Sequence, residues 1–297
     1  MLKFKAVLDE KCIKYAENKK ASEFTTFRIG GDCFVIYPEN ENELITVISE
    51  CCDKDIKYVL IGCGSNVLFP DNGYDGAVIM TQKLSYFSID GDIITAGCGT
   101  QLSAVCKAAL NASLQGLEFA YGIPGSLGGA VFMNAGAYGG EMRDVIKNVR
   151  AYSVAERCIR SFPCDECDFG YRHSLFSSGD YVILSADIIL KHGEYDEIRT
   201  VMDDLINRRK TKQPLNYPSA GSAFKRYPGR YTGQMIEEAG LKGFHIGGAE
   251  VSEKHAGFII NKGNATCCDV LSLMDHIICK IREREGITIE PEIRIIR

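Results

Sequence analysis

A run of glycines in the middle of the chain limits what this sequence can fold into. Tyr121-Gly-Ile-Pro-Gly-Ser-Leu-Gly-Gly-Ala130 continues into Met133-Asn-Ala-Gly-Ala-Tyr-Gly-Gly140. Glycine loses more conformational freedom on folding than any other residue, so ordering this stretch is costly. A close approach of the backbone to a flat ligand or to a pyrophosphate would explain why the glycines are there. The alternative is a packed loop between domains. Glu118 and Pro124 make the same region unsuitable as a simple membrane span.

A second glycine turn, Ile61-Gly-Cys-Gly-Ser-Asn66, follows a predicted strand at 58–61. It looks superficially like the start of a dinucleotide fingerprint, but the third glycine is missing and the following residues predict a turn and a strand instead of a helix. Successive backbone N–H groups in such a turn can still face an anion, and Ser65 and Asn66 add donors. Taken alone, a tight turn between strands is the better interpretation. Two such turns in one strand-rich region favour a bound nucleotide cofactor.

Composition places the chain among ordinary globular proteins, because 45% of its 297 residues are hydrophobic and 25% are charged. A chain of this length is near the size at which one core divides into two or three domains. Apolar periodicity predicts helices and strands, and Pro214 and Pro218 mark the main domain boundary. The expected helices cover 42–53, 101–114 (ended by Gly116), 195–210, 232–239 and 267–285, the last with a capping box at Thr266 and Asp269. The expected strands cover 58–61, 76–80, 93–97, 182–190, 257–261 and 292–296.

Charge and cysteine content exclude several classes of protein. The formal net charge of −5 argues against a uniformly basic nucleic-acid binder. The N-terminus has no apolar segment of signal-peptide length, so we expect a cytoplasmic protein. The 13 cysteines are scattered, and those inside apolar runs are predicted to be small buried hydrophobes: Cys51, Cys52, Cys106 and Cys279. The single C-x-x-C, Cys164 to Cys167, has no second ligand pair to complete a zinc site, so no metal site is predicted.

A basic stretch follows the predicted helix at 195–210. From Arg208 to Arg230 there are seven basic residues and no acidic one, which suits phosphate or pyrophosphate binding. A solvated charge run at a domain edge is the alternative. Lys225 and Arg226 fit that alternative less well, because they follow a turn of small residues that would present Ser222 beside them. No Gly-x-Ser-x-Gly motif is present, so a nucleophilic hydrolase is not supported.

Eight stretches taken together resemble the UDP-N-acetylenolpyruvoylglucosamine reductases, flavoenzymes of peptidoglycan precursor synthesis. They occur in the family's order and cover nearly the whole chain. They are Thr25–Gly31, Gly62–Asn66, Gly122–Gly129, Asn134–Tyr138, Phe169–Arg172, Ala220–Lys225, His255–Asn261 and Glu290–Arg294. Any one would be weak, but the ordered set is highly specific.

The resemblance implies an α+β fold. An FAD-binding domain of two α+β subdomains with the PCMH-type flavin fold would occupy 1–80 and 81–200. A C-terminal α+β substrate-binding domain would occupy 201–297, with its last strand returning toward the flavin site. The implied partner is UDP-N-acetylglucosamine enolpyruvate, with FAD as cofactor and NADPH as co-substrate. We expect a monomer without a nucleic-acid or membrane partner.

The resemblance also assigns roles to individual residues. Ser222 would donate a proton to the substrate carbon, while Arg172 and Glu292 would stabilise the enolate-like intermediate. Substrate binding would fall to Lys225, Arg226 and His255. The cofactor-binding residues would be Gly62, Cys63, Gly64, Ser65, Asn66, Val67, Gly122, Pro124, Gly125, Ser126, Gly129, Asn134, Gly136 and Ala137.

Two features beyond the motifs bear on this reading. We hypothesise that the positive charge of Lys225 favours the alkoxide of Ser222, because a serine hydroxyl is a poor acid. The chain lacks room for the tyrosine loop that the family's longer form inserts between Arg172 and Arg208, so it resembles the shorter form. The alternatives are an oxidase of the same flavin fold and a non-catalytic nucleotide-binding protein.

Overall fold

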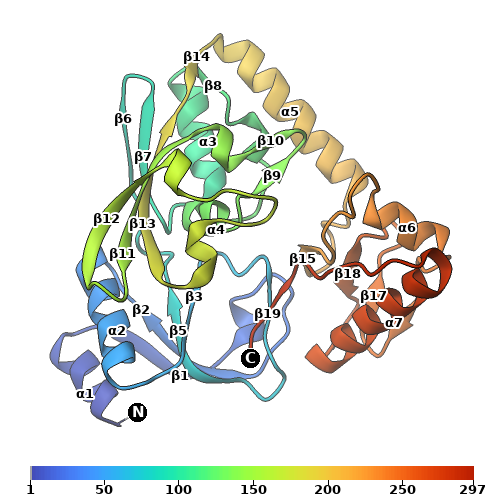
Figure 1. Ribbon diagram of the computed structural model, residues 1–297, viewed down its shortest axis with the longest axis horizontal. Helices are drawn as coiled ribbons and strands as arrows, with labels where there is room; N and C mark the ends of the chain where they lie inside the picture. Colours follow the sequence, from blue (N-terminus) through green and yellow to red (C-terminus); the bar gives the residue numbers. More distant parts are fainter. Residues whose placement is uncertain (1) are drawn as a thin grey trace. The chain divides into compact units, whose positions relative to one another are not determined.

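The computed structural model describes residues 2–297, which form two units (Figure 1). Unit 1 comprises the chain up to Ala16, Val35–Cys63 and Gly76–Arg208, and unit 2 comprises Glu17–Phe34, Gly64–Asp75 and Arg209–Arg297. The chain passes from one unit to the other after Cys63 and within β1 (Lys14–Lys20), β2 (Asp32–Tyr37), β5 (Tyr74–Met80) and α5 (Tyr195–Lys212). Each unit therefore consists of three separate pieces of sequence.

The larger sheet of unit 1 is antiparallel and has five strands. Its order is β12-β11-β13-β7-β6, made of β6 (Phe87–Asp90), β7 (Ile93–Gly97), β11 (Ile146–Ser153), β12 (Cys158–Pro163) and β13 (Tyr181–Ile189). The helix α4 (Leu127–Phe132) contacts β13 and β7, and α3 (Leu102–Asn111) contacts β7. β13 lies at the centre of the sheet, which explains why its residues Val182–Ile188 read as an almost continuous apolar run.

The smaller sheet has the order β1-β2-β5-β3. Within unit 1, β3 (Tyr58–Ile61) runs parallel to β5, with Tyr58 opposite Ala77 and Ile61 opposite Met80. The helix α2 (Glu41–Asp53) begins at Asn40, whose side chain accepts a hydrogen bond from the Glu43 N–H, and its predicted apolar face is buried. The remaining elements of this unit are α1 (Leu2–Glu10), which contacts α2, and the two-stranded pairs β8 (Leu114–Gln115) with β14 (Lys191–His192) and β9 (Gly136–Ala137) with β10 (Gly140–Glu141).

Unit 2 contains an antiparallel sheet with two helices beside it (Figure 1). The sheet order is β15-β18-β17-β16, made of β15 (Ser219–Ser222), β16 (His245–Ile246), β17 (Ala249–Val251) and β18 (Phe258–Asn261). The helix α7 (Cys267–Glu285) contacts β16, β17 and α6 (Thr232–Glu238). A short parallel pair joins β19 (Arg294–Ile295) to β4 (Val67–Leu68).

One hydrophobic core holds the three pieces of unit 2 together. Phe27 comes from the first piece, Leu68 from the second, and Phe224, Ile277 and most other members from the third. All four of these side chains are at most 4% exposed. The core therefore depends on apolar contacts between residues that are about 200 positions apart in the sequence, an order of separation that no local pattern encodes.

The start of α7 is held by three side chains. Thr266 and Asp269 form the predicted capping box, with two hydrogen bonds of 3.0 Å. The carboxylate of Asp71, from another piece of the same unit, also accepts the N–H groups of Cys267 at 2.7 Å and Cys268 at 3.1 Å. A helix leaves its first N–H groups without backbone partners, and the three side chains supply those partners here.

Several predicted elements have different limits in the structure. The helix expected over 101–114 ends at Asn111, because Ser113 adopts a left-handed conformation with a φ of 54°. Gly116 lies beyond β8 and does not end that helix. On α5, Ile198 and Met202 are buried, whereas Val201 is 46% exposed. The last strand, expected over 292–296, is only Arg294–Ile295 because its partner β4 has two residues.

Of the four cysteines predicted to be buried, two are buried in the structure and two are exposed. Cys51 and Cys106 are buried, whereas Cys52 and Cys279 are exposed. In α2, Cys51 lies on the same helical face as Leu44 and Ile48, and its neighbour Cys52 necessarily points elsewhere. The prediction was therefore wrong for Cys52 and Cys279, since an apolar run along a helix contains exposed positions too.

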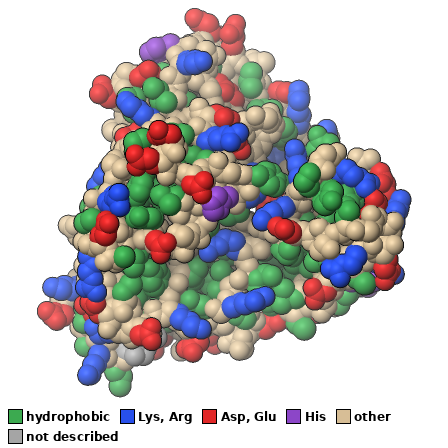
Figure 2. All heavy atoms as spheres, viewed as in Figure 1, with side chains coloured by type: hydrophobic (Ala, Val, Ile, Leu, Met, Phe, Trp, Pro, Cys, Tyr) green, Lys and Arg blue, Asp and Glu red, His purple; other side chains and the backbone are tan. Residues whose placement is uncertain are grey.

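Charged side chains of both signs are interspersed across the face that Figure 2 shows. This pattern agrees with a formal net charge of only −5 over the whole sequence. Within residues 2–297, no helix combines the length and the apolar character needed to cross a bilayer.

Candidate active site

Ser222 lies at the end of a strand that is interrupted just before it. In the pairing of β15 with β18, Ser219 is opposite Ile260 and Ser222 is opposite Phe258, with an irregularity between the two pairs. Gly221 occupies the left-handed region with a φ of 80°, which L side chains rarely adopt. Bulges of this kind turn a strand and redirect the next side chain, and they recur beside active sites. The small residues before Ser222 thus form a bulge that sets its direction.

Glu292 lies on the backbone segment next to Ser222. Its N–H donates to the carbonyl of Ala223 at 2.9 Å, and the N–H of Lys225 donates to the carbonyl of Glu290 at 2.8 Å. Phe224 and Pro291 form an antiparallel bridge between these two hydrogen bonds. The predicted proton donor and the predicted glutamate are therefore brought together by main-chain pairing over a distance of 70 residues in the sequence.

The turn that contains Asn66 is attached to the same segment. The side-chain amide of Asn66 donates to the carbonyl of Glu292 at 3.2 Å. The main-chain carbonyl of Asn66 accepts the N–H of Arg294 at 3.1 Å. Asn66 is thus hydrogen-bonded to the backbone on both sides of Ile293. Part of the second glycine turn therefore fixes the position of Glu292.

Lys225 pairs with the carboxylate of Glu290, a residue with no predicted role. Its Nζ lies 3.1 Å from Oε2 of Glu290, with side chains 37% and 71% exposed. An ion pair so exposed contributes between zero and about 1 kcal/mol. The guanidinium of Arg226 lies 4.8 Å from the centre of the Tyr231 ring. The suggested effect of Lys225 on Ser222 stays a prediction.

His255 lies in the turn that precedes Phe258, the residue opposite Ser222. Its Nδ1 accepts the N–H of Gly257 at 3.1 Å, so the neutral ring carries its proton on Nε2. Burial is the main cause that lowers the pKa of His255 below its ordinary value, because burial disfavours the charged ring. The carbonyl of Gly257 in turn accepts the N–H of Ala223 at 2.8 Å. His255 is thus a neutral Nε2–H donor held close to the Ser222 strand.

In unit 1, the two glycine stretches that predict a cofactor meet at Ser126. A Cβ added at Gly62 would lie 2.1 Å from the Ser126 hydroxyl oxygen, so only glycine fits at that position. Ser126 is 2% exposed, and its hydroxyl accepts the N–H of Gly129 at 3.3 Å, which begins α4. The two loops approach through backbone and small side chains alone. This cradle fits the close approach that a nucleotide cofactor requires.

Arg172 is attached to the second glycine stretch. It has a left-handed φ of 55°, and its Nη2 donates to the carbonyl of Gly136 at 3.2 Å. Asn134 is fully buried; its amide donates to the carbonyl of Gly170 at 3.0 Å and its Oδ1 accepts the N–H of Arg143 at 3.0 Å. The Asn134 side chain therefore holds the Arg172 loop, while a direct contact of Asn134 with a cofactor stays a prediction.

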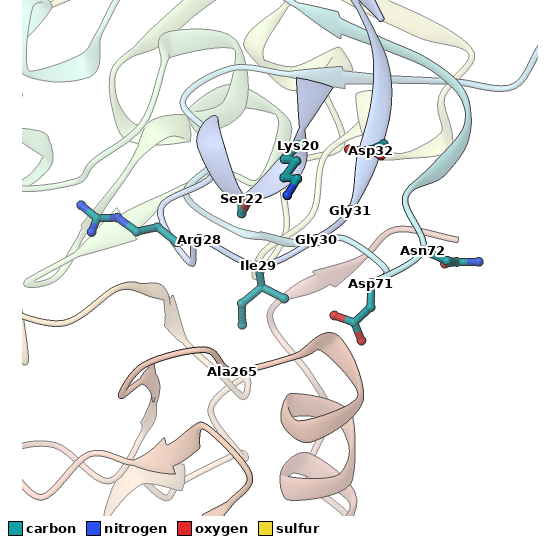
Figure 3. A pocket seen from close by; sticks show the side chains of 10 residues that line it. All are labelled: Lys20, Ser22, Arg28, Ile29, Gly30, Gly31, Asp32, Asp71, Asn72 and Ala265. Atoms are coloured by element: carbon teal, nitrogen blue, oxygen red, sulfur yellow. The ribbon is translucent and has the colours of Figure 1, made fainter. Parts of the chain in front are cut away.

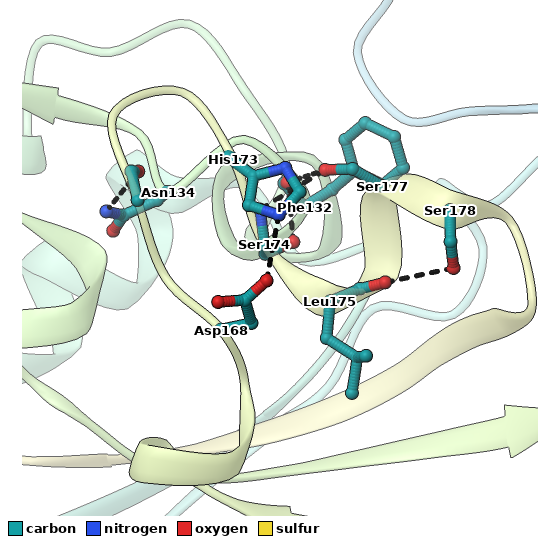
Figure 4. A network of polar contacts seen from close by, with 9 residues as sticks. Phe132, Asn134, Asp168, His173, Ser174, Leu175, Ser177 and Ser178 are labelled. Atoms are coloured by element: carbon teal, nitrogen blue, oxygen red, sulfur yellow. Dashed lines mark hydrogen bonds and ion pairs between the residues drawn. The ribbon is translucent and has the colours of Figure 1, made fainter.

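Serines that follow Arg172 in the sequence bond to the end of α4 (Figure 4). The hydroxyls of Ser174 and Ser177 both donate to the carbonyl of Phe132, at 2.7 and 3.1 Å. His173 and Asp168 pair at 3.1 Å, with side chains 52% and 77% exposed. The loop that carries Arg172 is thus attached through Gly170 before it and through Ser174 and Ser177 after it.

The predicted site residues fall into both units. Unit 1 holds Gly62, Cys63, Arg172 and the predicted residues between Gly122 and Ala137. Unit 2 holds Gly64–Val67, Ser222, Lys225, Arg226, His255 and Glu292. Within unit 2 the structure brings together Asn66, Ser222, His255 and Glu292. Within unit 1 it brings together Gly62 with Ser126, and Arg172 with Asn134 and Gly136.

Four residues that shape this arrangement had no predicted role. Gly221 forms the bulge, Gly257 fixes the His255 ring, Glu290 pairs with Lys225, and Thr26 bridges two loops of unit 2. All four lie inside stretches that resemble the family: Thr26 in Thr25–Gly31, Gly221 in Ala220–Lys225, Gly257 in His255–Asn261 and Glu290 in Glu290–Arg294. Their roles depend on tertiary partners, which the stretches do not reveal.

A cavity of about 500 Å³ opens on unit 2, and none of its lining residues is a predicted site residue (Figure 3). Its lining carries both signs of charge, with Lys20 and Arg28 as well as Asp32 and Asp71. The carboxylate of Asp71 already accepts two N–H groups of α7. The lining has no predominant charge, and Asp71 is already hydrogen-bonded to α7. The cavity therefore does not indicate a particular ligand.

The C-x-x-C pair follows β12, with Cys164 beginning a 3₁₀ turn (Cys164–Glu166) and Cys167 directly after that turn. Burial raises the pKa of both thiols, that of Cys167 to about 12. Such thiols are poor nucleophiles and poor metal ligands at neutral pH. In the part of the chain described, residues 2–297, no three His, Cys, Asp or Glu side chains come together to hold a metal ion.

Comparisons with known proteins point in one direction. Residues 213–296 match the family model for the C-terminal domain of UDP-N-acetylenolpyruvoylglucosamine reductase, and residues 33–158 match an FAD binding domain. The UDP-N-acetylenolpyruvoylglucosamine reductase of Clostridium perfringens (strain SM101 / Type A) is 47% identical over 277 residues, covering 93% of this chain and 90% of its own. That of Clostridioides difficile (strain 630) is 43% identical over 292 residues, covering 98% and 95%.

A solved structure is similar as well. The crystal structure of the Thermus caldophilus UDP-N-acetylenolpyruvylglucosamine reductase superposes with a TM-score of 0.83 at 31% sequence identity. The likeness covers 96% of this chain and 100% of that one.

Proposed function

Because the chain belongs to the UDP-N-acetylenolpyruvoylglucosamine reductase family, we propose that it reduces UDP-N-acetylglucosamine enolpyruvate to UDP-N-acetylmuramate with FAD and NADPH. The step would take place in the cytoplasm during peptidoglycan precursor synthesis. One observation of the site carries the proposal: main-chain pairing holds the segment of Ser222 next to that of Glu292. A proton donor and a polar group that act on the same substrate carbon must lie close together in this way. In this proposal, residues 1–80 and 81–200 form the two FAD-binding subdomains, and residues 201–297 form the substrate-binding domain.

The residues around the glycine cradle fit the cofactor. The predicted cofactor residues would hold FAD: Gly62, Cys63, Gly64, Ser65, Asn66, Val67, Gly122, Pro124, Gly125, Ser126, Gly129, Asn134, Gly136 and Ala137. Support comes from the tight approach of Gly62 to Ser126, where a side chain on the glycine could not be accommodated. When bound, FAD would supply hydride transfer from NADPH to the enolpyruvyl double bond.

The polar residues would handle the charge that follows hydride addition. Negative charge then develops on the neighbouring carbon and the substrate carboxylate, and donors aimed there lower the barrier. Arg172 would donate hydrogen bonds from its guanidinium, which its loop orients through Gly136 and Asn134. Glu292 would be the second group that stabilises this charge. Ser222 would give its hydroxyl proton to the carbon.

Substrate binding would fall to Lys225, Arg226 and His255. Cations suit the diphosphate of a UDP-sugar, and Lys225 and Arg226 follow directly on the Ser222 strand. His255, neutral and with its proton on Nε2, would donate a hydrogen bond to the substrate. The substitution Lys225→Ala separates two roles: slower chemistry would support alkoxide stabilisation at Ser222, and weaker binding alone would contradict it.

An anaerobic half-reaction tests the proposed function. The flavin of the purified protein is bleached with NADPH, the excess is removed, and UDP-N-acetylglucosamine enolpyruvate is added. We expect rapid return of the yellow colour in the wild-type protein and in Ser88→Ala, an exposed serine on β6. In Ser222→Ala, bleaching should persist while colour return slows at least about a hundredfold, the usual scale of general acid catalysis.

Two other outcomes would contradict the proposal. A bleached flavin that regains colour only in air would favour an oxidase of the same fold. A protein that takes up no flavin even when FAD is supplied would leave only a nucleotide-binding function.

A further inference from the structure

Thr26 joins the second glycine turn to the strand that carries Ser222. Its N–H donates to the carbonyl of Gly64 at 3.0 Å. Its hydroxyl donates to the carbonyl of Ser219 at 2.7 Å, across 193 residues of sequence. Thr26 belongs to the stretch Thr25–Gly31, which resembles the family but has no role in the proposed function.

The residues on either side of Thr26 are firmly anchored. The Thr25 hydroxyl donates to the carbonyl of Ala21 at 2.9 Å, and Thr25 is 6% exposed. Phe27 is fully buried in the core of unit 2, and its carbonyl accepts the side-chain amide of Asn261 at 3.2 Å. Because both neighbours are fixed, Thr26 is a rigid point from which Ser219 is held.

The Gly64 turn packs tightly against the segment that precedes Thr26. A Cβ at Gly64 would lie 2.4 Å from the carbonyl oxygen of Phe24 and 3.0 Å from the Cα of Thr25. The segment before Thr26 thus packs directly on the backbone of the turn. The turn continues into Asn66, which holds the backbone of Glu292.

On the strand side, the bond to Ser219 lies where the sheet gives least support. The ladder between β15 and β18 is irregular from Ser219 to Ser222, and Gly221 supplies the left-handed residue there. Three residues of strand span only about 10 Å. Because Ser222 is so close to Ser219 along the strand, a shift of the Ser219 carbonyl is expected to move the Ser222 hydroxyl by a similar amount.

We infer that Thr26 is a positioning residue that sets where Ser222 stands relative to the Gly64–Asn66 turn and to Glu292. The inference rests on the proposed function, in which Ser222 donates the proton and the turn helps to hold the cofactor. Thr26 acts through Ser219 and Gly64. All the residues in the argument belong to unit 2.

The test compares Thr26→Val, which keeps the shape but loses the hydroxyl, with Thr26→Ser, which keeps the hydroxyl. Both are studied as the FAD-containing protein. The matched control is Thr46→Val in α2, where the half-buried threonine hydroxyl also donates to a backbone carbonyl, that of Asn42 at 2.8 Å. In Thr26→Val, colour return on adding UDP-N-acetylglucosamine enolpyruvate should slow about tenfold, the effect of one neutral hydrogen bond. Bleaching by NADPH should change less than about twofold. Thr26→Ser and Thr46→Val should behave as wild type.

Two further readouts separate positioning from general damage. The ratio of colour-return rates in H₂O and D₂O should rise only in Thr26→Val, because proton transfer from a displaced Ser222 becomes more limiting. Amide hydrogen exchange, read by mass spectrometry and independent of turnover, should quicken severalfold in a peptide covering 219–223 of Thr26→Val only.

Three results would overturn the inference: unchanged colour return in Thr26→Val, an equal slowing of bleaching and colour return, or a Thr26→Ser variant as slow as Thr26→Val. Failure of the proposed function looks different, because wild-type protein itself would then show no substrate-driven colour return. In that case the exchange experiment still decides whether Thr26 holds the Ser222 strand.

Discussion

Gly221 controls the direction of Ser222 through its backbone conformation alone. A Cβ at this position would meet no atom within 4 Å, so the substitution Gly221→Ala strains only the φ of 80°. That strain costs roughly 1 kcal/mol. We expect the strand to relax toward ordinary dihedrals, which moves the Ser222 hydroxyl and slows substrate-driven colour return by about tenfold or more. Rapid-mixing absorbance and chemical denaturation measure the two effects.

Gly229→Ala is the matched control for that experiment. Gly229 has a φ of 75° and the same open surroundings, so its alanine variant carries a similar strain. It should lose comparable stability and keep its rate of colour return. Equal slowing in both variants would mean that strain in unit 2, and not the direction of Ser222, limits the reaction.

His255 gives the protein a pH dependence with a definite sign. Burial lowers its pKa in the folded protein, whereas the unfolded chain has a value near 6.5. As the pH falls below that value, the unfolded chain takes up a proton first, so the free energy of unfolding decreases. The contribution is fully present above pH 6.5 and is lost as the pH falls through the lower, folded pKa. Between pH 7.5 and 5.5, His255→Gln should lose less stability than wild type in urea denaturation.

The exposed His245 supplies the comparison for this pH effect. His245→Gln should follow the wild-type curve. If His255→Gln also follows it, burial of the His255 ring does not contribute to the pH dependence.

At the scale of elements, Asp71 is a stability determinant of α7. Asp71→Ala removes the partner of two backbone N–H groups at the start of a 19-residue helix. We expect a loss of roughly 1–2 kcal/mol, the range for a lost helix cap. Asp275, exposed in the middle of the same helix, should change stability by less than about 0.5 kcal/mol when replaced by alanine. Urea denaturation of both variants checks this, and equal losses would contradict it.

Helices with caps and apolar stripes were predicted within one or two residues. The limits of α2 and α7 follow from local features, namely Asn40, the Thr266–Asp269 pair and Gly286. The end of α3 was missed because a left-handed serine, Ser113, has no strong sequence signature. Two-residue strands such as β4 were also missed, since they exist only through their partners.

The candidate site was predictable as motifs but not as an arrangement. Ser222 and Glu292 could be named from their stretches, yet their pairing arises from a bridge between Phe224 and Pro291. The bond from Thr26 to Ser219 spans 193 residues, beyond the reach of any periodicity. The predicted cofactor contacts of Asn66 and Asn134 stay predictions, but their side chains also hold the Glu292 and Arg172 segments, which no motif indicates. Side-chain duties of this kind depend on tertiary structure.

At the scale of the whole molecule, the 13 cysteines divide by accessibility. Five are exposed and six are buried, while Cys63 and Cys164 are intermediate. Burial raises the pKa of Cys51 and of Cys98 to about 12, which suppresses the reactive thiolate. Brief treatment of the folded protein with iodoacetamide at neutral pH should therefore label the exposed five first. These are Cys12, Cys52, Cys158, Cys268 and Cys279.

Peptide mass spectrometry identifies the labelled positions, and the same treatment in urea should label all of the cysteines. Early labelling of Cys51 or Cys106 in the folded state would contradict the burial described for unit 1.

The composition of unit 2 from three pieces governs when it can fold on a ribosome. Phe27 and Leu68 are synthesised early, but most of their core partners belong to Arg209–Arg297. At translation rates of about 5–20 residues per second, the early pieces wait on the order of ten to forty seconds for those partners. Unit 1 has all of its residues once Arg208 has been added. During synthesis, the two early pieces of unit 2 are thus the natural clients of chaperones.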